Sequence, residues 1–167
     1  MDYESSDRTL EPRPPGLEDL VELCRSLNEK KVKYIVVGGM AIINAGFTHA
    51  TVDIDLLIDS SSDNVKRVKE ALLYLPDKAV KDVELTDVEN YTVVKVADEI
   101  VIDLMKSACG ITYEDCIGSI NKIKIRDVEI PFPNTELLYK MKQTLREKDK
   151  QDILFLEEKL KHNQKKN

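Results

Sequence analysis

The sequence lacks any long apolar run, and this absence excludes a membrane-spanning helix. No stretch approaches the roughly 18 consecutive apolar residues that mark a candidate bilayer span. The N-terminus is polar and acidic, without the apolar region of a secretory signal peptide. We therefore expect a cytoplasmic protein with no membrane partner.

Cysteine is scarce, and tryptophan is absent altogether. The cysteines are Cys24, Cys109 and Cys116, an odd number whose spacing matches no zinc-binding pattern. Reduced thiols in a cytosolic protein are the simplest interpretation. Cys24 falls on the apolar stripe of the first predicted helix, where we expect it to lie in the core.

An excess of positive charge is also missing. The chain has 167 residues and a formal net charge of −6, which argues against a protein that coats nucleic acid non-specifically. The lysine-rich stretch 159–166 is interpreted as a solvated tail. The length suits one domain, and we expect residues 16–167 to form it after a proline-rich, loose arm at residues 1–15.

Apolar periodicity predicts alternating helices and strands, with no internal repeat. A helix is expected from Leu17 with an apolar stripe through Leu27, a short helix over 40–45 and a third from the caps at 61–63 to Tyr74. Residues 77–90 read as irregular and 112–117 as a small helix or loop. The last helical region begins at 134 or 135, and its stripe resumes at Ile153. Strands are expected at 33–37, 51–58, 91–96, 99–105, 120–125 and 128–132. This order predicts a mixed α/β domain rather than a doubly wound parallel sheet.

Two carboxylates interrupt the strand predicted at 51–58. Asp53 and Asp55 share one face of that strand, with Cα atoms roughly 6.5–7 Å apart, because side chains alternate with period two. Carboxylates are poor strand residues and repel each other. A hard divalent cation between them, such as Mg²⁺, compensates for that cost.

A third carboxylate lies in the apolar segment Glu99–Met105. Asp103 occupies a position there at which an apolar residue is expected. If this strand neighbours the first, Asp53, Asp55 and Asp103 converge. Three acids on adjacent strands can hold two metal ions for phosphoryl or nucleotidyl transfer.

A glycine doublet precedes these acids. Gly38 and Gly39 fall between a predicted strand and a predicted helix. Because they lack Cβ atoms, backbone N–H groups can approach a phosphate closely, with the helix N-terminus behind them. The doublet and the acids thus suit the same ligand, a triphosphate.

The ordered set resembles the nucleotidyltransferase superfamily, which has the DNA polymerase β-like fold. Val37-Gly38-Gly39 is followed by thirteen residues and then by Asp53-Ile-Asp55-Leu, with Asp103 as the distal acid. The segments "GFTHATVDIDLLID" and "PFPNTELLYKMKQTLREKDKQDILFLEEKL" look like those of small prokaryotic stand-alone members, including components of toxin–antitoxin pairs. The resemblance covers nearly the whole chain from Leu17.

The resemblance implies a fold and a mechanism. The fold is a mixed β-sheet flanked by helices, with a C-terminal helical segment. Gly38 and Gly39 bind the β- and γ-phosphates of an NTP, and the three aspartates hold two Mg²⁺ ions, with Mn²⁺ as an alternative. A hydroxyl of an RNA 3′ end such as that of a tRNA, of a protein or of a small molecule then attacks the α-phosphate. A cognate toxin or antitoxin is the implied protein partner.

Further nucleotide contacts are expected at three positions. His49 stands where the family carries Arg, so it binds phosphate well only when protonated. Thr51 either contacts the nucleotide or makes a hydrogen bond within its loop. Of two helix lysines, Lys140 is preferred over Lys142 for the triphosphate because it precedes the inward Met141.

Several alternatives stay open at this point. Asp53 and Asp55 could be solvated residues of an edge strand, and Gly38-Gly39 could be a plain turn. His49 could be structural, and Lys148, Asp149 and Asp152 could form a solvated helix face. Four tyrosines are candidates for stacking on a base: Tyr34, Tyr91, Tyr113 and Tyr139. The alternative function is a nucleotide-binding or protein-interaction module without catalysis.

Overall fold

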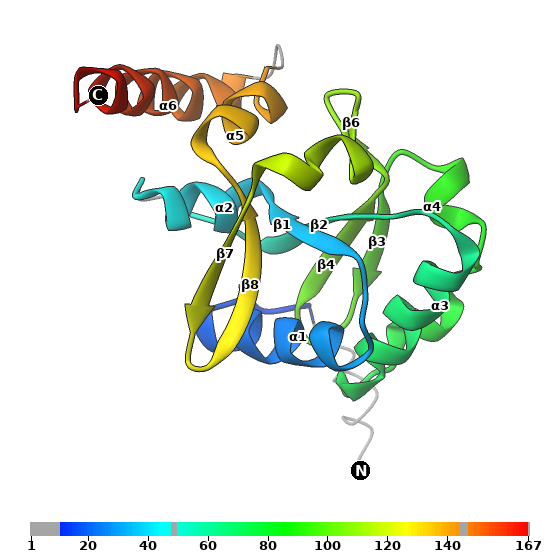
Figure 1. Cartoon of the computed structure of the whole chain (residues 1–167). Helices are drawn as coiled ribbons and strands as arrows, with labels where there is room; N and C mark the ends of the chain where they lie inside the picture. The colour runs from blue at the N-terminus through cyan, green and yellow to red at the C-terminus, as the bar shows by residue number, and fades with distance from the viewer. Residues whose placement is uncertain (1–10, 48–49, 144–146, 167) are drawn as a thin grey trace.

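The molecule is a mixed sheet between helices, seen in a computed structural model that describes residues 11–47, 50–143 and 147–166 (Figure 1). The helices are α1 (Leu17–Glu29), α2 (Gly38–Ala45), α3 (Ser62–Ala71), α4 (Asp87–Asn90), α5 (Thr135–Met141) and α6 (Glu147–Lys166), and the 3₁₀ turns are η2 (Leu72–Tyr74), η3 (Ala79–Asp82) and η4 (Glu114–Ser119). The strands are β1 (Tyr34–Val37), β2 (Asp53–Ile58), β3 (Val94–Ala97), β4 (Val101–Met105), β5 (Ser107–Ala108), β6 (Ile111–Thr112), β7 (Ile120–Ile125) and β8 (Val128–Pro133).

The central sheet has four strands in the order β1-β2-β4-β3. Strand β1 runs antiparallel to β2, β2 runs parallel to β4, and β3 runs antiparallel to β4. The parallel pair needs a crossover, which α3 and the turns after it supply. The sheet is therefore mixed, and the predicted mixed α/β class is confirmed.

The two faces of the sheet build two cores of different size. One face carries Ile54 and Leu56 of β2 and Ile102 and Leu104 of β4, which pack in the main core with α1 and α3. The other face carries Ile35, Val37 and Leu57, which pack in a smaller core with α5. Helices α5 and α6 lie on the side of the sheet away from α1 (Figure 1). The period of two in β2 thus assigns Asp53 and Asp55 to the face with the smaller core.

Several predicted elements are confirmed with small shifts. Helix α1 buries the expected stripe, including Cys24, although Leu17 at its first position is 48% exposed. Gly46 ends α2 with a φ of 114°, and the Ser61 side chain caps α3 by accepting a hydrogen bond from the Asn64 amide. The hairpin turn at Arg126 and Asp127 is also correct, because both residues adopt positive φ, as a two-residue type I′ turn requires.

Other predicted boundaries are wrong. Residues 77–90, expected to be irregular, form η3 and α4. The turn between β3 and β4 lies at Asp98–Ile100, where the Asp98 amide donates to the Ile100 carbonyl, and not at 97–98. Strands β5 and β6 are only two residues long each and give no alternating pattern to detect. Strand β8 extends one residue beyond the predicted 128–132, to Pro133.

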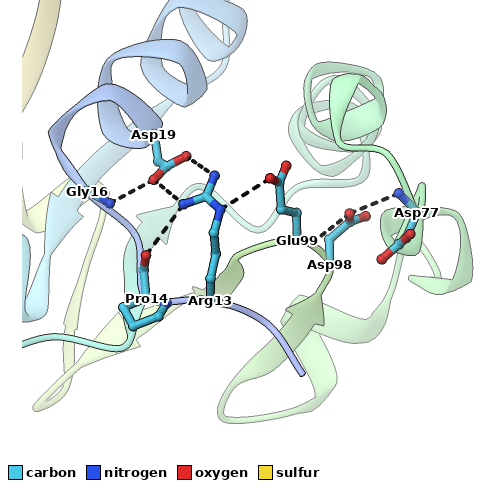
Figure 2. Close-up of polar contacts among 7 residues, drawn as sticks. All are labelled: Arg13, Pro14, Gly16, Asp19, Asp77, Asp98 and Glu99. Carbon is cyan, nitrogen blue, oxygen red and sulfur yellow. Dashed lines mark hydrogen bonds and ion pairs between the residues drawn. The ribbon is translucent and has the colours of Figure 1, made fainter. Parts of the chain in front are cut away.

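The segment before α1 is held by one arginine (Figure 2). The Arg13 guanidinium donates to both carboxylate oxygens of Asp19, at 2.7 and 2.8 Å, and to Glu99 at 3.2 Å. Asp19 also accepts a hydrogen bond from the Gly16 amide at 2.7 Å, which satisfies one free donor at the start of α1. The hydrogen bond from Arg13 lowers the pKa of Asp19. Arg13 thereby links the start of α1 to the β3–β4 turn.

The same turn is braced by a buried carboxylate. Asp98 is only 3% exposed and accepts hydrogen bonds from the amides of Asp77, Ala79 and Glu99 at 2.8–3.0 Å. These donors belong to the turn itself and to the segment that begins η3, and the contact to Asp77 appears in Figure 2. Asp98 therefore holds the β3–β4 hairpin against the crossover.

The described helices include none that could cross a bilayer, since none of them is both long enough and apolar enough. The three thiols are free, with Cys24 and Cys116 buried and Cys109 exposed.

Candidate active site

Three aspartates converge on one face of the central sheet. Asp55 of β2 is paired in register with Asp103 of β4, and Asp53 lies two residues earlier on the same face. One carboxylate oxygen from each of the three lies within 4.8 Å of the others. The predicted convergence is therefore confirmed, and the interpretation of Asp53 and Asp55 as solvated edge residues is wrong, because β2 is flanked by β1 and β4.

The first glycine lies against this cluster. Val37, the last residue of β1, is paired with Asp55, so Gly38 follows directly beside the acid. A Cβ atom at Gly38 would lie 2.1 Å from Oδ2 of Asp55 and 2.8 Å from its Cγ. Gly38 also has a φ of 68°, in the left-handed region that favours glycine. The close approach requires glycine here, beyond what a plain turn would need.

The acids and glycines line one cleft with a volume of about 480 Å³. This volume falls in the range of small-molecule sites, roughly 300–1,000 Å³. Its polar lining brings together four carboxylates and one ammonium: Asp53, Asp55, Asp103, Asp149 and Lys142. Gly38, Gly39 and Thr51 also line the cleft.

Negative charge accumulates in this cleft. Burial, together with the charges of Asp53 and Asp103, raises the pKa of Asp55 to about 7. The pKa of Asp53 is also raised, by burial first and then by Asp103. Three oxygen donors with unbalanced negative charge fit a hard divalent cation better than any soft metal. The residues present thus fit a hard divalent cation.

Two lysines offset part of this charge. Lys95 on β3 lies opposite Asp103 in the β3–β4 register, and its Nζ is 2.9 Å from Asp103 Oδ1. Lys142, at the end of α5, lies 3.3 Å from Asp149 and 3.2 Å from Asp152. The charge of Lys142 also lowers the pKa of Asp55. The sequence reasoning did not single out Lys95, and it preferred Lys140 to Lys142.

The remaining expected nucleotide contacts have different outcomes. Thr51 lines the cleft and donates a hydrogen bond from Oγ1 to the Asp53 carbonyl at 2.8 Å. His49 lies outside the described residues. Lys140 is exposed on α5 and does not line the cleft. Lys142 is the lysine among the described residues that line it. Asp149 and Asp152 are each 1% exposed, so their interpretation as a solvated helix face is wrong.

The four tyrosines do not gather at the cleft. Tyr34 is buried and donates to Asn28, and the Tyr139 hydroxyl donates to Glu157 on α6. Tyr113 packs against the smaller core. Tyr91 is 61% exposed and lies two residues before the cleft-lining Val93. None of the four tyrosines lines the cleft.

Asp55 is expected to make the metal-free protein less stable as the pH rises. Its pKa is near 3.8 in the unfolded chain and about 7 in the folded chain. The folded state therefore binds more protons over that range, and the resulting stabilisation is full below pH 4 and lost as the pH rises through 7. The asparagine in Asp55→Asn cannot ionise. The free energy of unfolding of this variant, relative to wild type, should therefore rise by roughly 2–4 kcal/mol between pH 4 and pH 8.

Urea unfolding in EDTA at both pH values measures this gain. Asp82→Asn, at an exposed acid in η3, is the matched control and should track the wild type. An Asp55→Asn protein that loses stability relative to wild type on going from pH 4 to pH 8 would contradict the assignment.

Comparisons with known proteins add a fold relationship. No protein-family model matches the sequence, and no curated protein matches it significantly. A crystal structure of a "putative nucleotidyltransferase" from Thermotoga maritima is similar with a TM-score of 0.51 and 14% identity, over 100% of this chain and 97% of that one. At this identity the likeness shows the fold alone. The chain has a nucleotidyltransferase-like fold, and its three acids and its glycine doublet lie together at one cleft of that fold.

Proposed function

We propose that this protein is a nucleotidyltransferase that moves a nucleoside monophosphate from an NTP to a hydroxyl acceptor, with pyrophosphate as the leaving group. The observation that carries the proposal is the convergence of Asp53, Asp55 and Asp103 within 4.8 Å, directly beside the backbone of Gly38. The fold shared with the Thermotoga protein supports the same class of reaction. Neither acids nor glycines alone carry this conclusion, since each pattern occurs in unrelated folds.

The chain's own residues divide the work in this proposal. The backbone at Gly38 and Gly39, on the β1 side, binds the terminal phosphates, and the start of α2 adds its positive dipole end. Asp53, Asp55 and Asp103 would hold Mg²⁺, or Mn²⁺ in its place. When bound, the metal would stabilise negative charge on the phosphates and activate the attacking hydroxyl. Lys142 lines the same cleft and places positive charge near the triphosphate on the α5 side.

The strand order supports one direction for the proposed reaction. Attacking and leaving oxygens are roughly in line in phosphoryl transfer. With the terminal phosphates on the β1 side, the acceptor hydroxyl enters from the β4 and β3 side, past Asp103. The acceptor belongs to one of three classes: an RNA 3′ end such as that of a tRNA, a protein side chain or a small molecule. A role as a cytoplasmic toxin–antitoxin component is part of the same proposal.

Thermal melting with each NTP, with and without Mg²⁺, tests the proposal. A ligand that binds only the native state adds about 2.7 kcal/mol at a hundredfold excess over its dissociation constant. In a chain of this size that corresponds to a rise in Tm of roughly 5–10 °C. We expect the rise only when an NTP and Mg²⁺ are both present, and only with an intact triad.

Asp53→Asn should lose this shift, while Asp82→Asn should keep it. The NTP that gives the largest shift identifies the preferred base. An NTP-dependent shift that needs no metal and survives Asp53→Asn favours the alternative, a nucleotide-binding module without catalysis. No shift with any NTP contradicts both readings.

A further inference from the structure

Lys95 places an ammonium group directly on one of the proposed metal ligands. Its Nζ lies 2.9 Å from Oδ1 of Asp103, which is a short, charge-assisted hydrogen bond. Lys95 is on β3 and Asp103 on β4, and the two residues are cross-strand partners on the cleft face. The contact therefore follows from the sheet register.

The two partners differ greatly in freedom. The Asp103 side chain is 11% exposed, whereas the Lys95 side chain is 58% exposed. Strand β3 is the outer strand of the central sheet, so the lysine can turn toward solvent without disturbing either core. Lys142, by contrast, has an 11% exposed side chain and lies between Asp149 and Asp152. Of the two lysines, Lys95 is the one that can leave.

A divalent ion and this ammonium compete for Oδ1 of Asp103 in the observed arrangement. Like charges at such short range repel strongly, and the repulsion doubles when one of the ions is divalent. The carboxylate oxygen that accepts the Lys95 proton also offers the lone pairs that a metal needs. Binding of the ion through Oδ1 of Asp103 therefore requires the ammonium to move away.

We propose that Lys95 is the resident counter-cation of the metal site and that a divalent ion binds by displacing it. This inference rests on the proposed function, because it takes the three aspartates as the metal ligands. Lys95 is then a positioning residue that neutralises Asp103 while the site holds no metal. It weakens the affinity of the site for metal and so raises the concentration at which the ion binds.

Mn²⁺ binding, followed by the electron paramagnetic resonance signal of the free ion, tests this without any activity measurement. Lys95→Met keeps the aliphatic stem and removes the charge. We expect the dissociation constant for Mn²⁺ to fall about five- to tenfold, as removal of a nearby competing positive charge predicts. Lys95→Arg should keep the wild-type affinity or weaken it.

Lys106→Met is the matched control because it changes the net charge equally. Lys106 directly follows β4, but its Nζ donates to the Glu89 carbonyl at 2.6 Å and lies 3.5 Å from the Glu89 carboxylate. The affinity of Lys106→Met for Mn²⁺ should stay within twofold of wild type. If the dissociation constant for Mn²⁺ falls equally in both methionine variants, the effect belongs to overall charge and the proposal is overturned.

A second measurement separates competition from a change in the fold. In EDTA at pH 8, Lys95→Met should melt below the wild type, because the carboxylates lose their counter-cation. Saturating Mn²⁺ should remove that difference. If wild type binds Mn²⁺ and Lys95→Met binds it equally or more weakly, this inference alone fails. If none of the variants binds Mn²⁺, the metal site of the proposed function fails with it.

Discussion

Gly38→Ala is expected to disrupt the site because the added methyl group clashes with Asp55. The new Cβ would lie 2.1 Å from Asp55 Oδ2 and 3.0 Å from Asp55 Cβ, so the whole side chain has to shift. The positive φ of Gly38 adds strain of roughly 1–2 kcal/mol, and overpacking adds about 1–3 kcal/mol. We expect a loss of stability of about 2–4 kcal/mol and loss of the shift produced by Mg²⁺ and NTP.

Gly110→Ala separates strain from the clash. Gly110 has a φ of 78°, close to that of Gly38, and a Cβ built on it meets nothing within 4 Å. It should therefore show the backbone strain alone and keep Mn²⁺ binding. Urea unfolding and Mn²⁺ titration of both variants make the comparison. If Gly38→Ala binds Mn²⁺ like wild type, the close approach to Asp55 has no role in shaping the site.

Lys142→Met is expected to have the second large effect. The ammonium lies between two carboxylates that are almost inaccessible to solvent, Asp149 and Asp152. Breaking a buried ion pair by removing one partner typically costs 3–5 kcal/mol, because the remaining charge stays buried. We expect a loss of about 3 kcal/mol in urea unfolding at pH 7, together with weaker NTP binding.

Lys140→Met is the matched control two residues earlier on the same helix. Lys140 is exposed, and an exposed charge contributes about 0–1 kcal/mol to stability. If the triphosphate contacts Lys142, NTP affinity should fall in Lys142→Met and stay unchanged in Lys140→Met. The reverse pattern would restore the sequence-based preference for Lys140. If Lys142→Met is too unstable for titration, Lys142→Arg takes its place, because arginine keeps the charge but changes its geometry.

The triad was predictable from the sequence because its pattern is local. Period-two alternation places Asp53 and Asp55 on one face, and an acid in the apolar segment 99–105 marks Asp103. The pairing of Asp55 with Asp103 was conditional on strand order, which alternation does not reveal. Likewise the doublet at Gly38 suggested a close backbone approach, but the neighbour that it approaches depends on the register of β1 against β2.

Lys95 was missed because of the turn between β3 and β4. A turn at 97–98 pairs Lys95 with Ile100 and so places the lysine on the face of the sheet opposite to Asp103. The observed turn, Asp98–Ile100, pairs it with Asp103. Asp98 is the residue that could have corrected the predicted position of the turn, because an aspartate at the start of a turn can accept backbone hydrogen bonds.

Lys142 could not be chosen over Lys140 from helical spacing. Helix α5 ends at Met141, so Lys142 is its C-terminal cap and follows no helical stripe. Its place in the cleft depends on Asp149 and Asp152, which lie on the next helix. Contacts between separate helices leave no periodic trace in the sequence, and the same holds for the burial of the two acids.

The contact between Gly38 and Asp55 also constrains how related chains can diverge. With an acid at position 55, a side chain at position 38 has no room, so the two positions should change together. A descendant that loses the acid is released from this restriction and can accept alanine or serine at position 38. The identity of that one residue is therefore an inexpensive marker in sequence comparison, separating copies that keep the acid cluster from copies in which it has decayed.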